Sequence, residues 1–186
     1  MGAGEHPTVT TQVPSSWTPF NDFGVTSDSG GASRGVGLWD VGKVARDPCH
    51  SIGHLYDPGP TVDDLVSALE AQVTRHATTP TDVTLAGHAG KYLEWSVPAD
   101  VVVTGDGDFA GCDVQDDGHR NFVSWDGTGG EGERWQQMAG QIDQLWILDV
   151  NGQRLVVDAN HSPNATQAQV DEEDQIVASL RFVSAA

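Results

Sequence analysis

A β-hairpin is the most strongly specified structure in this sequence. Residues 145–157 read LWILDVNGQRLVV, two apolar runs on either side of Asn151-Gly152. Asn-Gly supplies the positive φ angles of a two-residue type I′ turn, so the turn fixes the register of both strands. Counting outward predicts these pairs: Val150 with Gln153, Asp149 with Arg154, Leu148 with Leu155 and Trp146 with Val157. The face carrying Trp146, Leu148, Leu155 and Val157 is expected to face the core, and the other face carries the Asp149–Arg154 pair.

Two further segments show the pattern of helices. Thr61 and Asp64 form a capping box ahead of an apolar stripe at helical spacing, which predicts a helix over 61–76. Thr166 and Gln169 begin a second helix over 166–180 in the same way. Short β-branched or aromatic runs between turn residues predict the strands. These cover 8–13, 17–20, 23–26, 35–45, 82–85, 91–97, 121–125 and 134–138.

The order of these elements predicts the α+β class. Strands lie between helices without βαβ alternation, so we expect a single antiparallel β-sheet with the helices 61–76 and 166–180 packed on it. Residues 1–8 are expected to be a disordered leader and residues 9–186 a single globular domain. Residues 1–5 lack the basic and apolar regions of a secretory signal, and no apolar run approaches the ~20 residues of a membrane span. If the natural protein is exported, its leader or anchor lies outside this chain.

The chain is strongly acidic. It holds 27 Asp and Glu against 9 Lys and Arg, a formal net charge of −18. Such a surface repels nucleic acid and anionic lipid headgroups, which excludes both as expected partners. It attracts cations or basic partners, or it serves only as the solvated surface of an exported or high-salt protein. The second role is the commoner one for surface charge.

Cys49 and Cys112 are the only cysteines. An isolated pair in an acidic, glycine-rich chain predicts one disulfide formed in an oxidising compartment. The alternative is a pair of reduced, buried thiols in a cytosolic protein. If the two met in space beside His50, His54 or His119, they would also offer zinc ligands. Their spacing resembles no standard zinc finger, and oxidised cysteines do not bind zinc, so ordinary loop histidines are expected.

An acidic loop follows the 91–97 strand. Residues 104–119 read TGDGDFAGCDVQDDGH, with glycines between the carboxylates. Ca²⁺ is bound by several oxygen ligands on a flexible loop, so a calcium site is one interpretation, and an exposed acidic turn without any cofactor is the other. The EF-hand template is not met, because no Glu stands at its twelfth position. The candidate ligands are Asp106, Asp108, Asp113, Asp116 and Asp117.

Two of the six tryptophans flank a Gly-rich segment. Trp125 and Trp135 lie on either side of residues 126–133 and are the candidate ligand-binding residues, because exposed aromatic rings stack on sugars and other flat ligands. The alternative for each is an ordinary place in the core. The sequence contains neither the Gly-x-Ser-x-Gly nor the His-Glu-x-x-His catalytic motif. We therefore name no catalytic residue and favour a protein that is not an enzyme.

Several stretches resemble a poorly characterised group of actinobacterial secreted or membrane-tethered domains. The resemblance spans most of the chain and is carried by residues 13–28, 38–50, 56–69, 82–100, 141–159 and 176–182. It implies an extracytoplasmic location and carries over no catalytic residue. The element order is also similar to the Mog1p/PsbP-like sandwich of some actinobacterial lipoproteins. That similarity implies the same α+β arrangement and says nothing of function.

These observations lead to three functional hypotheses. The first is a non-catalytic extracytoplasmic sensor or binding module of a cell-envelope protein, with a small molecule, glycan or protein as its partner. The second is a secreted carbohydrate-active enzyme or carbohydrate-binding domain, with acids of the 106–117 loop near Trp125. The third is a calcium-stabilised structural domain. A deep cleft that places two carboxylates beside an exposed tryptophan would favour the second over the first.

Overall fold

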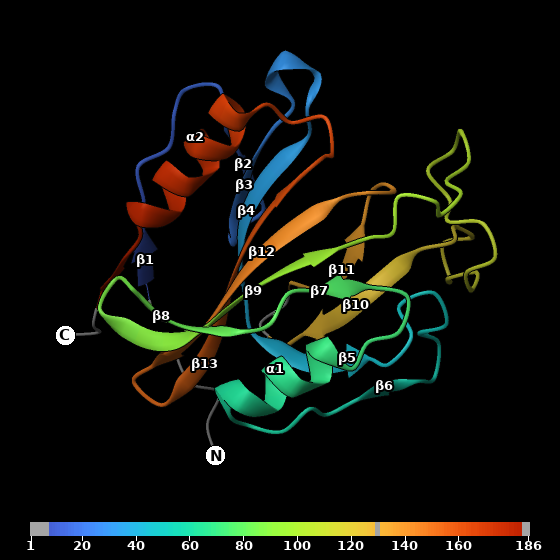
Figure 1. Ribbon diagram of the computed structural model, residues 1–186, viewed down its shortest axis with the longest axis horizontal. Coiled ribbons are helices and arrows are strands. Elements are labelled where there is room, and N and C mark those ends of the chain that lie inside the picture. Colours follow the sequence, from blue (N-terminus) through green and yellow to red (C-terminus); the bar gives the residue numbers. More distant parts are fainter. Residues whose placement is uncertain (1–7, 129–130, 184–186) are drawn as a thin grey trace.

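The computed structural model describes residues 8–128 and 131–183 (Figure 1). Of these residues, 43% lie in strands and 14% in helices, so the fold is mostly β. The strands form three antiparallel sheets. The expected leader, residues 1–8, lies outside the described residues except for Thr8, which begins the first strand. No helix in the described part of the chain has the length and apolar character needed to cross a membrane.

The largest sheet has eight strands and contains the predicted hairpin. Asn151 and Gly152 form its turn with φ angles of 56° and 86°, and every predicted pair is present, including Leu148 with Leu155. The neighbouring strands follow in spatial order, with β8 paired to β9 at one side. They are β2 (Thr18–Phe20), β3 (Gly24–Ser27), β4 (Arg34–Trp39), β13 (Gln153–His161), β12 (Ile142–Val150), β9 (His88–Ser96), β7 (His76–Ala77) and β8 (Thr81–Leu85).

The other two sheets are smaller. Four strands form one of them, in the order β11 (Glu133–Gln136), β10 (Phe122–Gly127), β5 (Val41–Ala45) and β6 (Leu55–Tyr56). The other pairs β1 (Thr8–Thr10) with β14 (Arg181–Val183). The described residues also include a short 3₁₀ turn, η1 (Ser29–Gly31).

The prediction of an α+β fold with a single antiparallel sheet and helices packed on it is therefore wrong, and a Mog1p/PsbP-like sandwich is not confirmed. The predicted strand 35–45 is two strands: β4 belongs to the large sheet and β5 to the four-stranded one. Asp40 stands between them, outside both strands. The alternation of apolar residues continues on both sides of Asp40. The sequence pattern therefore does not show that the chain passes from one sheet to the other there.

The two α-helices begin as predicted, but the first ends early. The Thr61 hydroxyl accepts a hydrogen bond from the Asp64 amide at 3.1 Å and caps α1 (Val62–Glu70). The chain then leaves the helix: the Val73 amide donates to the Arg46 carbonyl at 3.0 Å in place of a helical bond. The Gln72 side chain donates to the Ala45 and Ser124 carbonyls, each at 2.7 Å. The second helix, α2 (Gln167–Ala178), lies within the predicted 166–180.

The large sheet is buried on both faces. Leu145 and Ile147 of β12 pack with α1 and the four-stranded sheet, while Leu148 and Val150 pack with α2. Alternate residues of a strand point to opposite faces, so α1 and α2 cover opposite faces of the sheet. The hairpin face predicted to lie in the core does so. Its opposite face, expected to carry the Asp149–Arg154 pair, is also core except near the turn.

Candidate functional site

A cleft of about 540 Å³ opens between the two larger sheets. On one side lies β11, an edge strand of the four-stranded sheet, and on the other lie β2, β3 and β4 at the edge of the large sheet. A volume of this size is typical of sites for small molecules. The lining includes Phe20, Phe23, Gly24, Arg34, Gly37, Trp39, Glu131, Glu133, Arg134, Trp135 and Asp158.

Aromatic side chains form the rim and one wall of the cleft. Phe20 and Trp135 stand at the rim with 50% and 46% of their surfaces exposed. Phe23 and Trp39 lie behind Phe20, with Phe23 edge-to-face on Trp39 at 4.9 Å between ring centres. Gly37 leaves room for this wall, because a Cβ there would approach within 3.0 Å of Trp39 Nε1. The wall and rim therefore present several aromatic ring faces against which the apolar part of a ligand can pack.

A chain of four buried charges lies at the base of the cleft, and we call it the ion network. Arg134 of β11 donates from Nε to Asp158 Oδ2 of β13 at 2.6 Å and from Nη2 to Asp143 Oδ1 of β12 at 2.5 Å. Asp143 Oδ2 lies 3.8 Å from Nη1 of Arg75, which follows α1. All four side chains are at most 5% exposed, and Arg134 and Asp158 form part of the cleft lining.

Burial dominates the titration of this network. It raises the pKa of Asp158 to about 6, against the opposing effect of Arg134 and with a contribution from Asp143. Burial also lowers the pKa of Arg75 to about 9, so its guanidinium stays protonated at neutral pH. Burial acts to lower the pKa of Arg134, but the carboxylates of Asp158 and Asp143 outweigh this effect, so the pKa of Arg134 is raised. The two carboxylates therefore compensate the charges of both buried guanidinium groups.

Four buried polar atoms of the cleft lining have no hydrogen-bond partner in the described residues. They are the acceptors Asp158 Oδ1 and Glu131 Oε2 and the donors Trp39 Nε1 and Arg34 Nε. Buried polar groups in proteins are almost always hydrogen-bonded, because an unpaired one loses its bonds to water without replacement. Bound water or a ligand in the cleft would supply the missing partners.

The two tryptophans predicted to bind ligand lie in different environments. Trp135 stands at the rim of the cleft. Trp125 has no exposed surface and stacks on Trp95, with ring centres 5.8 Å apart and planes 4° from parallel. Its ring belongs to the core, so its assignment to a ligand site is corrected. The reason is its position on β10, a central strand of its sheet, whereas Trp135 lies on the edge strand β11.

The charged groups of the cleft were not predicted from sequence. Arg134 and Asp158 are 24 positions apart, and only the packing of β11 against β13 brings them together. Glu131 and Glu133 carried a weak signal, since they lie in the Gly-rich segment beside Trp135. The acids singled out instead, in the 106–117 loop, are absent from the residues that line the cleft.

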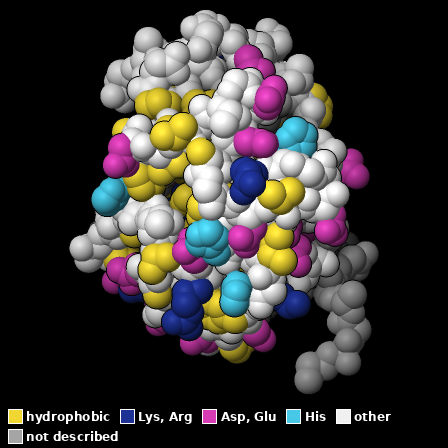
Figure 2. All heavy atoms as spheres, turned by 90° about the vertical axis from the view of Figure 1, so that its right-hand side faces the viewer, with side chains coloured by type: hydrophobic (Ala, Val, Ile, Leu, Met, Phe, Trp, Pro, Cys, Tyr) yellow, Lys and Arg dark blue, Asp and Glu magenta, His cyan; other side chains and the backbone are white. Residues whose placement is uncertain are grey.

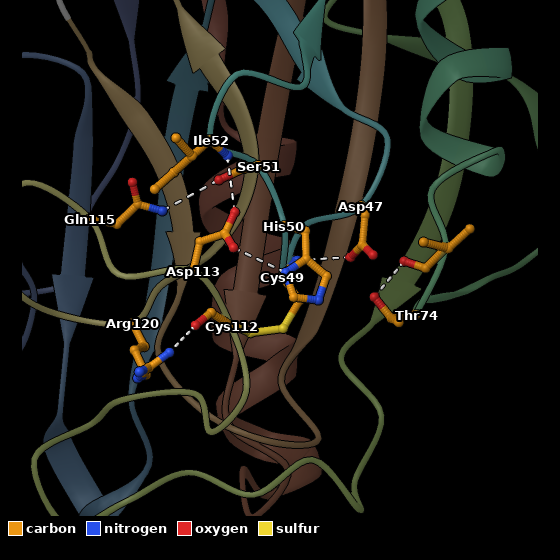
Figure 3. Close-up of a disulfide and its surroundings, with 11 residues drawn as sticks. Asp47, Cys49, His50, Ser51, Ile52, Thr74, Cys112, Asp113, Gln115 and Arg120 are labelled. Atoms are coloured by element: carbon orange, nitrogen blue, oxygen red, sulfur yellow. Dashed lines mark hydrogen bonds and ion pairs between the residues drawn. A yellow bond between two sulfur atoms is a disulfide. The ribbon is translucent and has the colours of Figure 1, made fainter.

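The disulfide joins Cys49, in the loop after β5, to Cys112 in the long loop before β10, with Cα atoms 4.4 Å apart (Figure 3). Beside it, His50 Nδ1 lies 3.1 Å from Asp113 Oδ1. The same carboxylate accepts a hydrogen bond from the Ile52 amide at 3.3 Å. Both sulfur atoms are bonded to each other, which removes the alternative of reduced thiols and the zinc site that needed them.

The five candidate calcium ligands do not converge on one point. Asp108 Oδ1 lies 3.0 Å from His119 Nδ1, Asp113 pairs with His50, and Asp117 accepts from the His119 amide at 2.9 Å. Within residues 8–128 and 131–183, no group of three or more His, Cys, Asp or Glu side chains is arranged to hold a metal ion. Figure 2 shows the side of the molecule that lies at the right of Figure 1, where acidic and histidine side chains are interspersed with hydrophobic ones.

Comparison with known proteins gives structural likeness without a sequence family. No protein-family model matches the chain, and no curated protein does. The fold is similar to a crystal structure of LpqN, involved in cell envelope biogenesis of Mycobacterium tuberculosis, with a TM-score of 0.44 and 10% sequence identity. The likeness covers 98% of this chain and 87% of that chain. At this TM-score it supports no conclusion about the function of the present chain.

Proposed function

We propose that this protein is a non-catalytic, extracytoplasmic binding module of the cell envelope whose ligand is a small molecule held in the cleft between β11 and β2–β4. The observation that carries the proposal is the cleft lining. An aromatic rim at Phe20 and Trp135 lies above a base with buried, unpartnered polar atoms at Asp158 and Glu131. Apolar walls with a few convergent polar groups are the usual composition of small-molecule sites.

The disulfide supports the extracytoplasmic part of the proposal. Cys49 and Cys112 are bonded, and neither is free to act as a catalytic or metal-binding thiol. Structural disulfides persist in oxidising compartments and are rare where glutathione and thioredoxin keep thiols reduced. The formal net charge of −18 is also typical of an exported, solvated domain.

The residues of the cleft favour binding over catalysis. Among the described residues that line it there is neither histidine nor cysteine, so these residues offer no pair of a nucleophile and an imidazole base. The guanidinium of Arg134 is fully engaged: Nη1 donates to the Trp135 carbonyl at 2.6 Å, and the other two nitrogens bind Asp143 and Asp158. These contacts fix the base of the cleft and leave no free cation there to activate a substrate.

A second candidate is a carbohydrate-active or carbohydrate-binding domain. It is favoured by Glu131 and Glu133, which line the same cleft as the exposed Trp135. Partial desolvation and the nearby acids Asp126, Asp117 and Asp116 raise the pKa of Glu133, as a general acid requires. Hydrolysis of chromogenic glycosides that is lost in Glu133→Gln would select this function over the first.

The cleft can be tested without knowing its natural ligand. A library of soluble fragments of mixed charge and polarity is titrated into the ¹⁵N-labelled protein, and amide and indole NMR shifts are followed. We expect the binding fragments to shift the Trp135 indole and the amides of Gly24 and Gly37. Trp135→Ala should abolish these shifts, while Val102→Ala, which removes another exposed apolar side chain outside the cleft, should not. Fragments that leave the cleft resonances unmoved would contradict the proposal.

A further inference from the structure

The cleft has an excess of negative charge after its ion pairs are matched. Arg34, one of the two cations in its lining, pairs with Glu172 at 2.6 Å. Arg134, the other, is neutralised within the ion network, where two guanidinium groups meet two carboxylates. Glu131 and Glu133 line the cleft as well, and neither forms an ion pair within the described residues. A ligand that enters the cleft therefore meets two uncompensated carboxylates.

The unpartnered oxygens require a donor. Asp158 Oδ1 belongs to a side chain that is 1% exposed, and its other oxygen is already bonded to Arg134. Glu131 Oε1 accepts from the Asp40 amide at 3.3 Å, which leaves the buried Oε2 without a partner. A protonated amine carries three donors and no acceptor, so it complements such oxygens better than a hydroxyl does. Its charge also offsets the excess of the two glutamates.

The rest of the cleft is complementary to an apolar group that carries the amine. The exposed rings of Phe20 and Trp135 attract a cation at their faces and cover apolar surface beside it. Trp39 Nε1 and Arg34 Nε remain as buried donors, which oxygens of the ligand would satisfy. The net charge of −18 raises the local concentration of small cations around the whole protein.

From these observations we infer that the cleft selects a small amphipathic cation, a primary ammonium group on an aromatic or alkyl body. The ammonium group binds Glu131 and Asp158, with Glu133 adding attraction at the mouth, and the body packs on Phe20 and Trp135. The inference rests on the proposed function and names the ligand class of that same cleft.

The test compares three probes of similar size and different charge: phenethylamine, 2-phenylethanol and phenylacetate. Each is titrated into the labelled protein at pH 7 and low ionic strength, and the dissociation constant is taken from the shifts of cleft resonances. We expect phenethylamine to bind about tenfold more tightly than 2-phenylethanol, because a partly buried charge-assisted hydrogen bond is roughly twice as strong as a neutral one. Phenylacetate should bind most weakly, and added salt should weaken phenethylamine alone.

Matched variants locate the effect. Glu131→Gln should remove most of the preference for the amine over the alcohol, and Glu133→Gln should reduce it. Glu70→Gln makes the same change in net charge on an exposed residue at the end of α1 and should leave the preference intact. Equal binding of amine and alcohol in the cleft would overturn the cation inference and leave the proposed function standing. If neither these probes nor the fragment library moves a cleft resonance, both fall.

Discussion

Two regions of this protein hold carboxylates against cationic side chains in opposite environments. In the ion network, Asp143 and Asp158 bind Arg75 and Arg134 between two sheets, with at most 5% of any side chain exposed. In the acidic loop and beside the disulfide, Asp108 and Asp113 pair with His119 and His50, whose side chains are more than half exposed. Buried charges interact strongly and depend on their partners, whereas exposed pairs are weakened by water and salt.

The difference shows why local clustering of acids was a poor guide to the site. Five aspartates within the 106–117 stretch suggested a metal site, yet Asp108, Asp113 and Asp117 already have hydrogen-bond partners close by. The ion network draws its members from β11, β12, β13 and the segment after α1. It becomes a feature only when the strands are paired and the sheets are packed.

The largest loss of stability is expected at Asp143. Asp143→Ala leaves Arg134 and Arg75 without one of their carboxylates in a buried place and should cost about 3–5 kcal/mol of unfolding free energy. Urea unfolding at pH 7 measures it. The matched change in the exposed pair, Asp108→Ala, should leave the midpoint nearly unchanged. Equal losses in the two variants would show that burial does not separate these regions.

The disulfide gives the next largest effect. Cys49 and Cys112 are 63 positions apart, and replacing both by serine frees this loop in the unfolded chain. The chain-entropy relation puts the loss of stability at about 4 kcal/mol. Hydrogen exchange would also show where it acts, because Val97, Phe109 and Phe122 pack with Cys112 in a small cluster of their own. Exchange that quickens equally in all strands, instead of first in this cluster, would argue against a local anchoring role.

The hairpin was the most predictable part of the fold, because Asn151-Gly152 determines its turn and register without any knowledge of the rest. The capped helix starts at Thr61 and Thr166 were predictable for the same local reason. The assignment of strands to sheets was not, since the change of sheet at Asp40 depends on packing between distant segments. Of the cleft, only Trp135 was anticipated, and its neighbour in the prediction, Trp125, is buried.

The exposed pairs should respond to pH separately from each other. Hydrogen bonds with Asp108 and Asp113 raise the pKa of His119 and His50 above 6.5, and the pKa of each aspartate is lowered in return. Each pair therefore stabilises the folded protein at pH values between the folded-state pKa of its aspartate and that of its histidine. The stabilisation is lost as pH rises through the pKa of the histidine or falls through the pKa of the aspartate. In NMR titrations, Asp108→Asn should lower the pKa of His119 and leave His50 unchanged, with Asp113→Asn giving the converse. A shift of both histidines in either variant would show that the pairs are coupled.

The smallest effect expected is that of calcium. Asp108 Oδ1 is engaged by His119 and by the Arg120 amide, and Asp113 is engaged by His50 and the Ile52 amide, so a cation would have to displace these donors. At a net charge of −18, any monovalent salt should raise the melting temperature by screening repulsion. Submillimolar Ca²⁺ should add nothing beyond matched ionic strength. A calcium-specific rise that disappears in the Asp106→Asn/Asp108→Asn variant would show instead that the acidic loop rearranges to bind the ion, and would reverse the contrast drawn between the two regions.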